Sequence, residues 1–155
     1  MSKRIVVSSL VGVLAVGGIT AGGLAVASAT TKSPTKTETT LENTSVRYVA
    51  PSGSRAGSLT FTAEVSDDSG VKGLKVLVWP ASSKLDPTEA ELRHVDSATC
   101  ESTTDETSRC TYSLKVTKDD VADMDKGTWY VSALATAKDG GTAFAPRVAT
   151  FDVAG

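Results

Sequence analysis

Residues that could do chemistry are few in this chain. His94 is the one histidine among 155 residues, so a Ser-His-Asp or Cys-His arrangement would have to use it. It follows Arg93 at the end of a predicted short helix, a position typical of a solvent-facing side chain. Carboxylates are plentiful, but their positions fit helix starts and turns better than acid–base catalysis. The sequence therefore predicts no catalytic residue and no cofactor, and favours a protein that is not an enzyme.

Cys100 and Cys110 are the two cysteines of the chain, separated by a short polar stretch. An even pair at this spacing in an oxidising compartment predicts a disulfide. On the chain-entropy estimate, closing a loop of this size stabilises the fold by roughly 2–3 kcal/mol. A metal site is the weaker interpretation, because no further residue has metal-ligand spacing around the pair.

Two aspartate-containing turns offer oxygen ligands for a hard cation. Asp67 and Asp68 precede Ser69 and Gly70, and Asp139 precedes a glycine pair. Aspartate is an ordinary turn residue, because its side chain bonds to nearby backbone N–H groups. Should both turns share one end of a sandwich, the three carboxylates could also form a weak calcium site. The turn interpretation is preferred, so no metal ligand is assigned.

A strand, a turn and a second strand position the first pair of aspartates. Residues 58–65 alternate apolar and polar side chains, which predicts a half-buried strand. Residues 71–79 follow the turn and carry Leu74, Val76 and Val78 on one face. Such a pair of strands must bury its apolar face against another layer.

Further strands and two short helices complete the predicted fold. Strands are expected at Val46–Pro51, Val95–Cys100, Cys110–Val116, Thr128–Lys138 and Thr142–Val153. The helices are expected to begin at Asp86, with Pro87 next and Glu89 closing a capping box, and at Thr117. Seven strands predict an all-β fold: a two-sheet immunoglobulin-like sandwich with short helical connectors and one disulfide.

Two stretches, FTAEVSDDSGVKGLKVLVW and GTWYVSALATAKDGG, resemble bacterial immunoglobulin-like and fibronectin-III-like extracellular domains. The matching residues are Asp68, Ser69, Gly70 and Val71, then Gly127, Trp129, Ala137, Asp139 and Gly140. The whole chain, with its glycine-rich leader, polar tether and WPASSKLDPTEAELRHV, is similar to small secreted actinobacterial proteins of streptomycete type that carry a domain of unknown function. These resemblances imply fold and secretion, and they supply no activity.

The beginning of the chain predicts export. Residues 1–29 have two basic residues, an uncharged apolar run and a small-x-small end, which is typical of a signal peptide cleaved between Ala29 and Thr30. A retained membrane anchor is the alternative, because the run is long enough to span a bilayer. Residues 30–45 are rich in threonine and predict a disordered tether, open to glycosylation. Residues 46–155 form the predicted domain.

The overall charge excludes two classes of partner. The formal net charge is −2, and removal of the basic leader makes the mature chain more acidic. Nucleic-acid binding needs a basic surface, as does binding to anionic lipid head groups. We therefore expect neither partner, and no stable membrane insertion after signal cleavage.

Strand parity predicts an apolar outer face on the sheet formed by the third, sixth and seventh strands. Its members are Leu77, Trp79, Tyr130, Leu134, Phe144 and Val148. An uncovered face of this kind is a candidate binding surface. The alternative is that the predicted helix Asp86–Arg93 covers it through Leu85 and Leu92. A bulge in either strand would reverse the assignments.

The sequence thus favours a secreted, non-catalytic binding domain outside the cell, whose partner is an extracellular protein or a cell-wall component. The alternative is a small inhibitor of an extracellular protease or hydrolase. An inhibitor presents a rigid loop, and the disulfide-bounded loop Glu101–Arg109 is the candidate, with Arg109 suited to a trypsin-like pocket.

Overall fold

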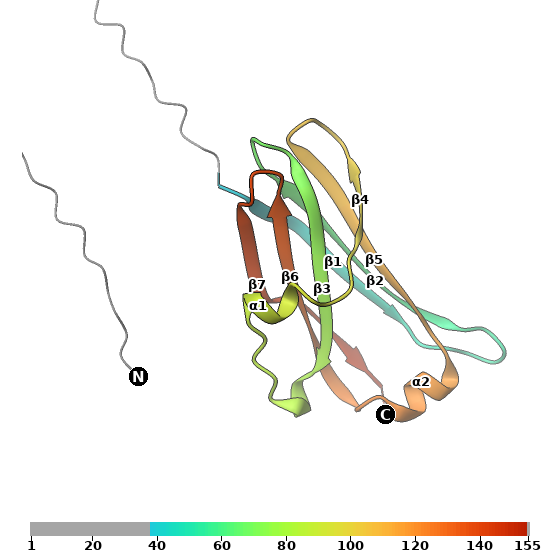
Figure 1. Cartoon of the computed structure of the whole chain (residues 1–155). Coiled ribbons are helices and arrows are strands. Elements are labelled where there is room, and N and C mark those ends of the chain that lie inside the picture. The colour runs from blue at the N-terminus through green and yellow to red at the C-terminus, as the bar shows by residue number, and fades with distance from the viewer. Residues whose placement is uncertain (1–37, 155) are drawn as a thin grey trace, which may run out of the picture. The chain divides into compact units, whose positions relative to one another are not determined.

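The structure, a computed structural model, describes residues 38–154. Its strands are β1 (Thr40–Val49), β2 (Gly57–Ser66), β3 (Val71–Pro80), β4 (Thr99–Ser102), β5 (Thr107–Val116), β6 (Gly127–Ala137) and β7 (Thr142–Val153). One antiparallel sheet has the order β1-β2-β5-β4 and the other the order β3-β6-β7 (Figure 1). This is the strand order of a constant-type immunoglobulin sandwich, so the predicted all-β fold is confirmed.

The core lies between the two sheets and is built by the predicted alternation. Along β2, Phe61 and Val65 are fully buried and face Leu74, Val76 and Val131 of the opposite sheet. Fully burying a side chain of this size stabilises a fold by roughly 1.5–3 kcal/mol. The other buried members of this core are Leu59, Ala63, Cys110, Tyr112, Val116, Ala133, Ala135, Phe151 and Val153.

The first strand begins earlier than predicted. β1 starts at Thr40 rather than Val46, so residues 40–45 belong to the sandwich and not to a disordered tether. Leu41 pairs with Val65 and packs against the core, which stabilises this polar stretch in strand form. Asn43 lies in a bulge with a φ of 48°. The predicted signal peptide, its cleavage site and residues 30–37 lie outside the described residues.

The cysteine-containing hairpin forms as predicted, but β4 is shorter than the predicted Val95–Cys100 and β5 is longer than the predicted Cys110–Val116. Cys100 of β4 and Cys110 of β5 are directly opposite and form the predicted disulfide. The segment before β4 was expected to belong to the same strand, but it pairs with β3 of the other sheet. The Val76 amide donates to the Asp96 carbonyl at 3.0 Å, and the Ala98 amide donates to Leu74 at 2.8 Å. The chain therefore crosses between the sheets immediately before the disulfide.

Short helical segments connect the strands: η1 (Ala81–Ser83), α1 (Glu89–Leu92) and α2 (Lys118–Asp123). The N-cap of α1 is Thr88 with Glu91 completing the capping box, so the predicted cap at Asp86 is wrong. The predicted start of α2 at Thr117 is confirmed, and Asp120 completes a capping box with it. Among residues 38–154, no helix has the length and apolar character that a membrane span requires.

Candidate functional site

Five of the six predicted face residues lie together on the outer side of the β3-β6-β7 sheet. Trp79 pairs with Tyr130, and Leu134 pairs with Phe144, so each pair lies side by side on neighbouring strands. Leu77 shares their parity on β3. The residues between them in sequence, such as Val76 and Ala133, belong to the core.

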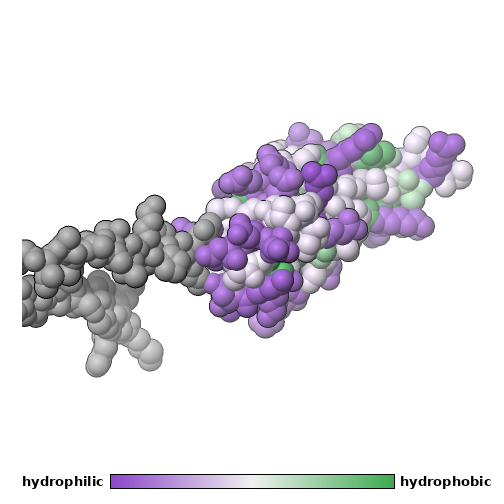
Figure 2. All heavy atoms as spheres, turned by 90° about the horizontal axis from the view of Figure 1, so that it is seen from above, coloured by the Kyte–Doolittle hydropathy of each residue, from purple (hydrophilic) through white to green (hydrophobic). Residues whose placement is uncertain are grey.

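The outer face is partly covered, as the helix alternative predicted. Trp79 and Leu134 are buried, with exposed fractions of 3% and 1%, so the six residues do not form an open apolar patch. Helix α1 packs against β3 and β6 (Figure 1). Its Leu92 is fully buried. The cover comes from Leu92, because Leu85 remains 40% exposed. Hydrophilic residues dominate the face of the domain seen in Figure 2, and hydrophobic ones show in small areas.

Val148 is the sixth residue, and its assignment to the outer face is wrong. The pairing of β6 with β7 passes from Val131–Ala149 to Ala133–Ala145, which leaves three residues of β7 opposite Ser132. This bulge contains Pro146, which has no N–H to donate to a ladder. The two extra residues leave the alternation the same on both sides of the bulge, but within the bulge it is interrupted, and Val148 packs against the core.

The same bulge brings Arg147 onto the outer face, a residue that the parity analysis missed. Its guanidinium lies 5.6 Å from the ring centre of Trp79 and 5.0 Å from that of Tyr130. The two rings are themselves 4.8 Å apart, and the Trp79 indole N–H donates to the Ser132 hydroxyl at 2.8 Å. An arginine held on aromatic rings keeps N–H groups available for a carboxylate or phosphate.

A groove with a volume of about 480 Å³ lies on this sheet near α1. We call it the cationic groove. Its lining residues are Lys72, Gly73, Leu74, Lys75, Arg93, Ser97, Leu134, Thr136, Gly140 and Thr142. Three of them are cationic, and none is acidic. Parity alone could not predict the groove, because Arg93 reaches it from the end of the helix that covers the sheet, one residue beyond α1.

Two of the three cations are positioned by hydrogen bonds. The Lys75 ammonium donates to the Val95 carbonyl at 2.9 Å. Arg93 pairs with Glu89 at 2.9 Å, and Thr142 donates to the same Glu89 oxygen at 3.1 Å. The pKa of Glu89 is lowered by the hydrogen bond from Arg93 and then by that from Thr142. The carboxylate of Glu89 thus ties α1 to β7 at the side of the groove.

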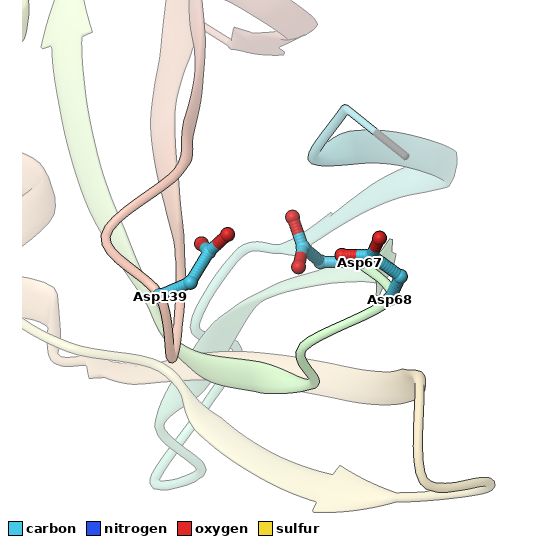
Figure 3. Close-up of side chains that lie close together, drawn as sticks. All are labelled: Asp67, Asp68 and Asp139. Atoms are coloured by element: carbon cyan, nitrogen blue, oxygen red, sulfur yellow. The ribbon is translucent and has the colours of Figure 1, made fainter. Parts of the chain in front are cut away.

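The aspartate turns meet at one end of the sandwich, as their predicted topology requires. Figure 3 shows Asp67 and Asp68 from the β2–β3 turn beside Asp139 from the β6–β7 turn. One carboxylate oxygen from each lies within 4.8 Å of the others. Oxygen atoms gathered in this way are of the type that calcium prefers.

Hydrogen bonds within the protein account for the conformation of Asp67, which is 1% exposed. Its carboxylate accepts from the Thr39 hydroxyl at 2.7 Å, and from the Ser69 amide at 2.9 Å and hydroxyl at 2.6 Å. The Ser69 hydroxyl, then the Thr39 hydroxyl and the Ser69 amide, lower the pKa of Asp67 to about 2. Asp139 in turn accepts from the Gly141 amide at 2.8 Å. The cluster is therefore explained as two interlocked turns, and no residue is assigned as a calcium ligand.

The inhibitor and enzyme alternatives depend on Arg109 and His94, and neither residue lies in an unusual structural environment. Arg109 lies within β5, not at the tip of the hairpin, and pairs with Glu64 of the neighbouring strand at 3.1 Å. His94 is exposed just after α1. Neither side chain projects from a loop that is held for recognition.

The sequence model of a family of unknown function, DUF5707, matches residues 41–135, more than half of the chain. The chain belongs to DUF5707. No curated protein matches it, and no solved structure does. The DUF5707 match runs from β1 to β6, so it includes Lys72, Lys75 and Arg93 of the cationic groove. Arg147 of β7 lies beyond the matched range.

Proposed function

We propose that this protein is a secreted, non-catalytic binding domain and that its cationic groove holds an anionic polymer of the bacterial cell wall. The observation that carries the proposal is the charge of the groove. Lys72, Lys75 and Arg93 line it, and the carboxylate at its side, Glu89, is paired with Arg93, although the formal net charge of the chain is −2. Cations concentrated in one groove of an acidic protein attract an anionic ligand specifically to that place.

The shape of the surface suits an extended ligand. The groove lies on the β3-β6-β7 sheet, and Arg147 is exposed on the outer face of the same sheet above Trp79 and Tyr130. A polymer with repeated phosphate or carboxylate groups could contact the groove and Arg147 together. Wall polymers have this chemistry, whereas a single small anion would use one of the two sites.

Secretion rests on the leader and on the disulfide. The first 29 residues have the pattern of a signal peptide, and a disulfide such as Cys100–Cys110 persists in an oxidising compartment. The resemblance to streptomycete-type secreted proteins favours a Gram-positive wall as the surface that the exported domain first meets.

Co-sedimentation with purified streptomycete cell wall tests the proposal. The chain is produced with its own leader in a streptomycete host and collected from the culture medium. We expect it to pellet with the wall at low salt and to be released at high salt, because exposed charge pairs are screened. Lys72→Glu should weaken binding about two- to fivefold, within the range of exposed ion pairs.

Lys118→Glu is the matched control, because it makes the same charge change at an exposed position on α2, away from the groove. Equal losses in the two variants would mean that net charge, and not the groove, determines binding. A chain that stays in the supernatant at low salt would contradict wall binding, and capture of a soluble acidic protein from the medium would then assign the groove to that partner.

A further inference from the structure

Strand β5 has a free edge over its last residues. β4 pairs with β5 only from Thr99–Thr111 to Ser102–Ser108, and before Thr99 the chain bonds to β3 of the other sheet. Figure 1 shows the short β4 near one end of the long β5. β5 continues to Val116, and on its other side it pairs with β2 over its whole length. Residues 113–116 therefore form an edge within a long strand, and we call this stretch the β5 edge.

The alternation along β5 determines which backbone groups lie on this edge. The Thr107 carbonyl accepts from the Thr103 amide at 2.9 Å, on the side of β4, and the carbonyl before it accepts from the Asp67 amide at 2.9 Å, on the side of β2. In an antiparallel ladder, every second residue directs both its N–H and its C=O to the same side. No register shift interrupts either pairing of β5. The N–H and C=O groups of Ser113 and Lys115 therefore point to the free edge.

The other sheet edges have features that prevent the addition of a strand. β1 has a bulge between Glu42 and Ser45, and β7 has one that contains Pro146. Part of the β3 edge is covered, because Val76 and Leu74 bond to the segment before β4. β4 is only four residues long. The β5 edge has neither bulge nor proline and is not covered in this way, so its backbone groups are open to a partner.

The side chains of the β5 edge specify the sequence of an occupant. Leu114 and Val116 border an open, mostly apolar cavity of about 290 Å³ between the sheets, together with Val78 and Met124. Leu114 is 38% exposed, and Lys115 is exposed on the outer face of its sheet. Side chains directly opposite on antiparallel strands interact, and opposite charges stabilise the pair. An added strand should therefore have apolar residues opposite Leu114 and Val116, and an acidic residue opposite Lys115.

We propose that the β5 edge binds an extended segment of another protein, in which an acidic residue lies between two apolar ones, as a strand antiparallel to β5. Main-chain hydrogen bonds provide affinity in strand addition, and alternate side chains provide specificity. The free stretch is short and ends against β4, which suits an extended segment better than the long edge of a second folded sheet. The proposal does not depend on the cationic groove, which lies on the β3-β6-β7 sheet.

The peptide acetyl-Val-Glu-Val-Thr-amide is the probe, with its glutamate opposite Lys115 and its second valine opposite Leu114. It is added at millimolar concentration to the secreted chain, and amide hydrogen exchange is followed by NMR. The Ser113 and Lys115 amides should exchange rapidly in the free chain, and the peptide should slow both. Absence of protection by the peptide would overturn the proposal. So would protection of both amides in a free chain that sediments as a dimer, because a second copy would then occupy the edge.

Methylation of single peptide nitrogens tests the direction of the hydrogen bonds. The N–H groups of the glutamate and the threonine should donate to β5, so methylation of either should weaken binding about three- to tenfold, the equivalent of one hydrogen bond. Methylation of the second valine is the matched control. Its N–H points away from β5, so binding should be unchanged. Equal losses for the three methylated peptides would overturn strand addition in this register.

A charge exchange tests the side-chain pattern. Lys115→Glu should weaken binding about two- to fivefold, and a peptide with lysine in place of glutamate should restore it. Lys84→Glu makes the same charge change at an exposed position after η1 and should leave binding unchanged. Equal losses in the two variants would overturn the pairing with Lys115. Because Lys115 lies outside the cationic groove, Lys115→Glu should affect wall binding no more than Lys118→Glu does, so the two proposals fail separately.

Discussion

The two ends of the sandwich treat a buried polar side chain in opposite ways. At the turn end, the Asp67 carboxylate accepts three hydrogen bonds from Thr39 and Ser69. At the opposite end, the Tyr48 hydroxyl has no partner among the described residues and its ring lines a cavity. The comparison shows that the two ends differ in how completely a buried polar group is hydrogen-bonded. The carboxylate at the turn end is fully hydrogen-bonded, whereas the hydroxyl at the opposite end is buried without a partner among the described residues.

We call the turn end the closed end. The largest loss of stability is expected there, from the substitution Asp67→Asn. In Asp67→Asn, the amide nitrogen cannot accept, so a donor from Thr39 or Ser69 loses its partner. Because the folded-state pKa of Asp67, about 2, lies below the unfolded value of about 3.9, the ionised carboxylate stabilises the fold. That contribution is complete above about pH 4 and is lost as the pH falls through about 2.

Thermal melts between pH 2 and pH 7 measure this effect. The wild-type Tm should fall more steeply on acidification than that of Asp67→Asn. Glu91 and Asp120 also have lowered pKa values, because each accepts hydrogen bonds from its capping threonine, and they give both proteins a common slope of the same sign. Parallel curves for the two proteins would show that Asp67 does not contribute in this way.

A smaller loss of unfolding free energy is expected from Gly141→Ala at the same end of the sandwich. A methyl group there would lie 2.7 Å from the Thr39 hydroxyl oxygen and 3.2 Å from an Asp139 carboxylate oxygen, so the interlocked turns must move apart. Such overpacking costs about 1–3 kcal/mol of unfolding free energy. Gly73→Ala is the control, because a methyl group at Gly73 meets nothing within 4 Å. Urea denaturation of both variants measures the difference, and equal losses would contradict the crowding at Gly141.

At the opposite end of the sandwich, which carries Tyr48 and which we call the open end, a substitution should leave stability unchanged or raise it. Tyr48→Phe removes a hydroxyl that has no partner, so the free energy of unfolding should stay the same or rise by up to about 1 kcal/mol. Urea denaturation checks this. A clear loss of stability would mean that the hydroxyl does bond within the protein and that the two ends do not differ as described.

The smallest effect is expected from divalent cations at the closed end. The oxygens of Asp67 already accept hydrogen bonds, so millimolar calcium should raise the Tm no more than magnesium does. A calcium-specific rise that Asp139→Asn abolishes would show that the closed end is a metal site.

Local patterns predicted the sheets, because alternation and turn chemistry are read from neighbouring residues. Strand β2, the Asp67–Gly70 turn and the disulfide follow from them. The start of β1 did not, because Leu41 is a lone apolar residue and the strand depends on pairing with β2. Val148 was misplaced because nothing in the alternation marks that it lies within the bulge at Pro146, where the alternation is interrupted.

The candidate sites were harder to predict than the fold. Parity placed Trp79, Tyr130 and Leu134 correctly on one face, but it could not show that Leu92 buries part of that face. The cationic groove joins residues from a strand and a helix that are far apart in sequence, including Lys72 and Arg93. The cavity of about 290 Å³ beside Tyr48, Trp129 and Phe151 depends on how well distant side chains fill space, which no periodic pattern records.

Sedimentation with two preparations of one cell wall tests the proposed function most directly. One preparation is intact, and the other has had its anionic polymers removed while the peptidoglycan remains. At low salt, the secreted chain should bind the intact wall and lose most of its binding to the stripped wall. Equal binding to both preparations, or binding to neither, would contradict a domain that holds an anionic wall polymer in its cationic groove.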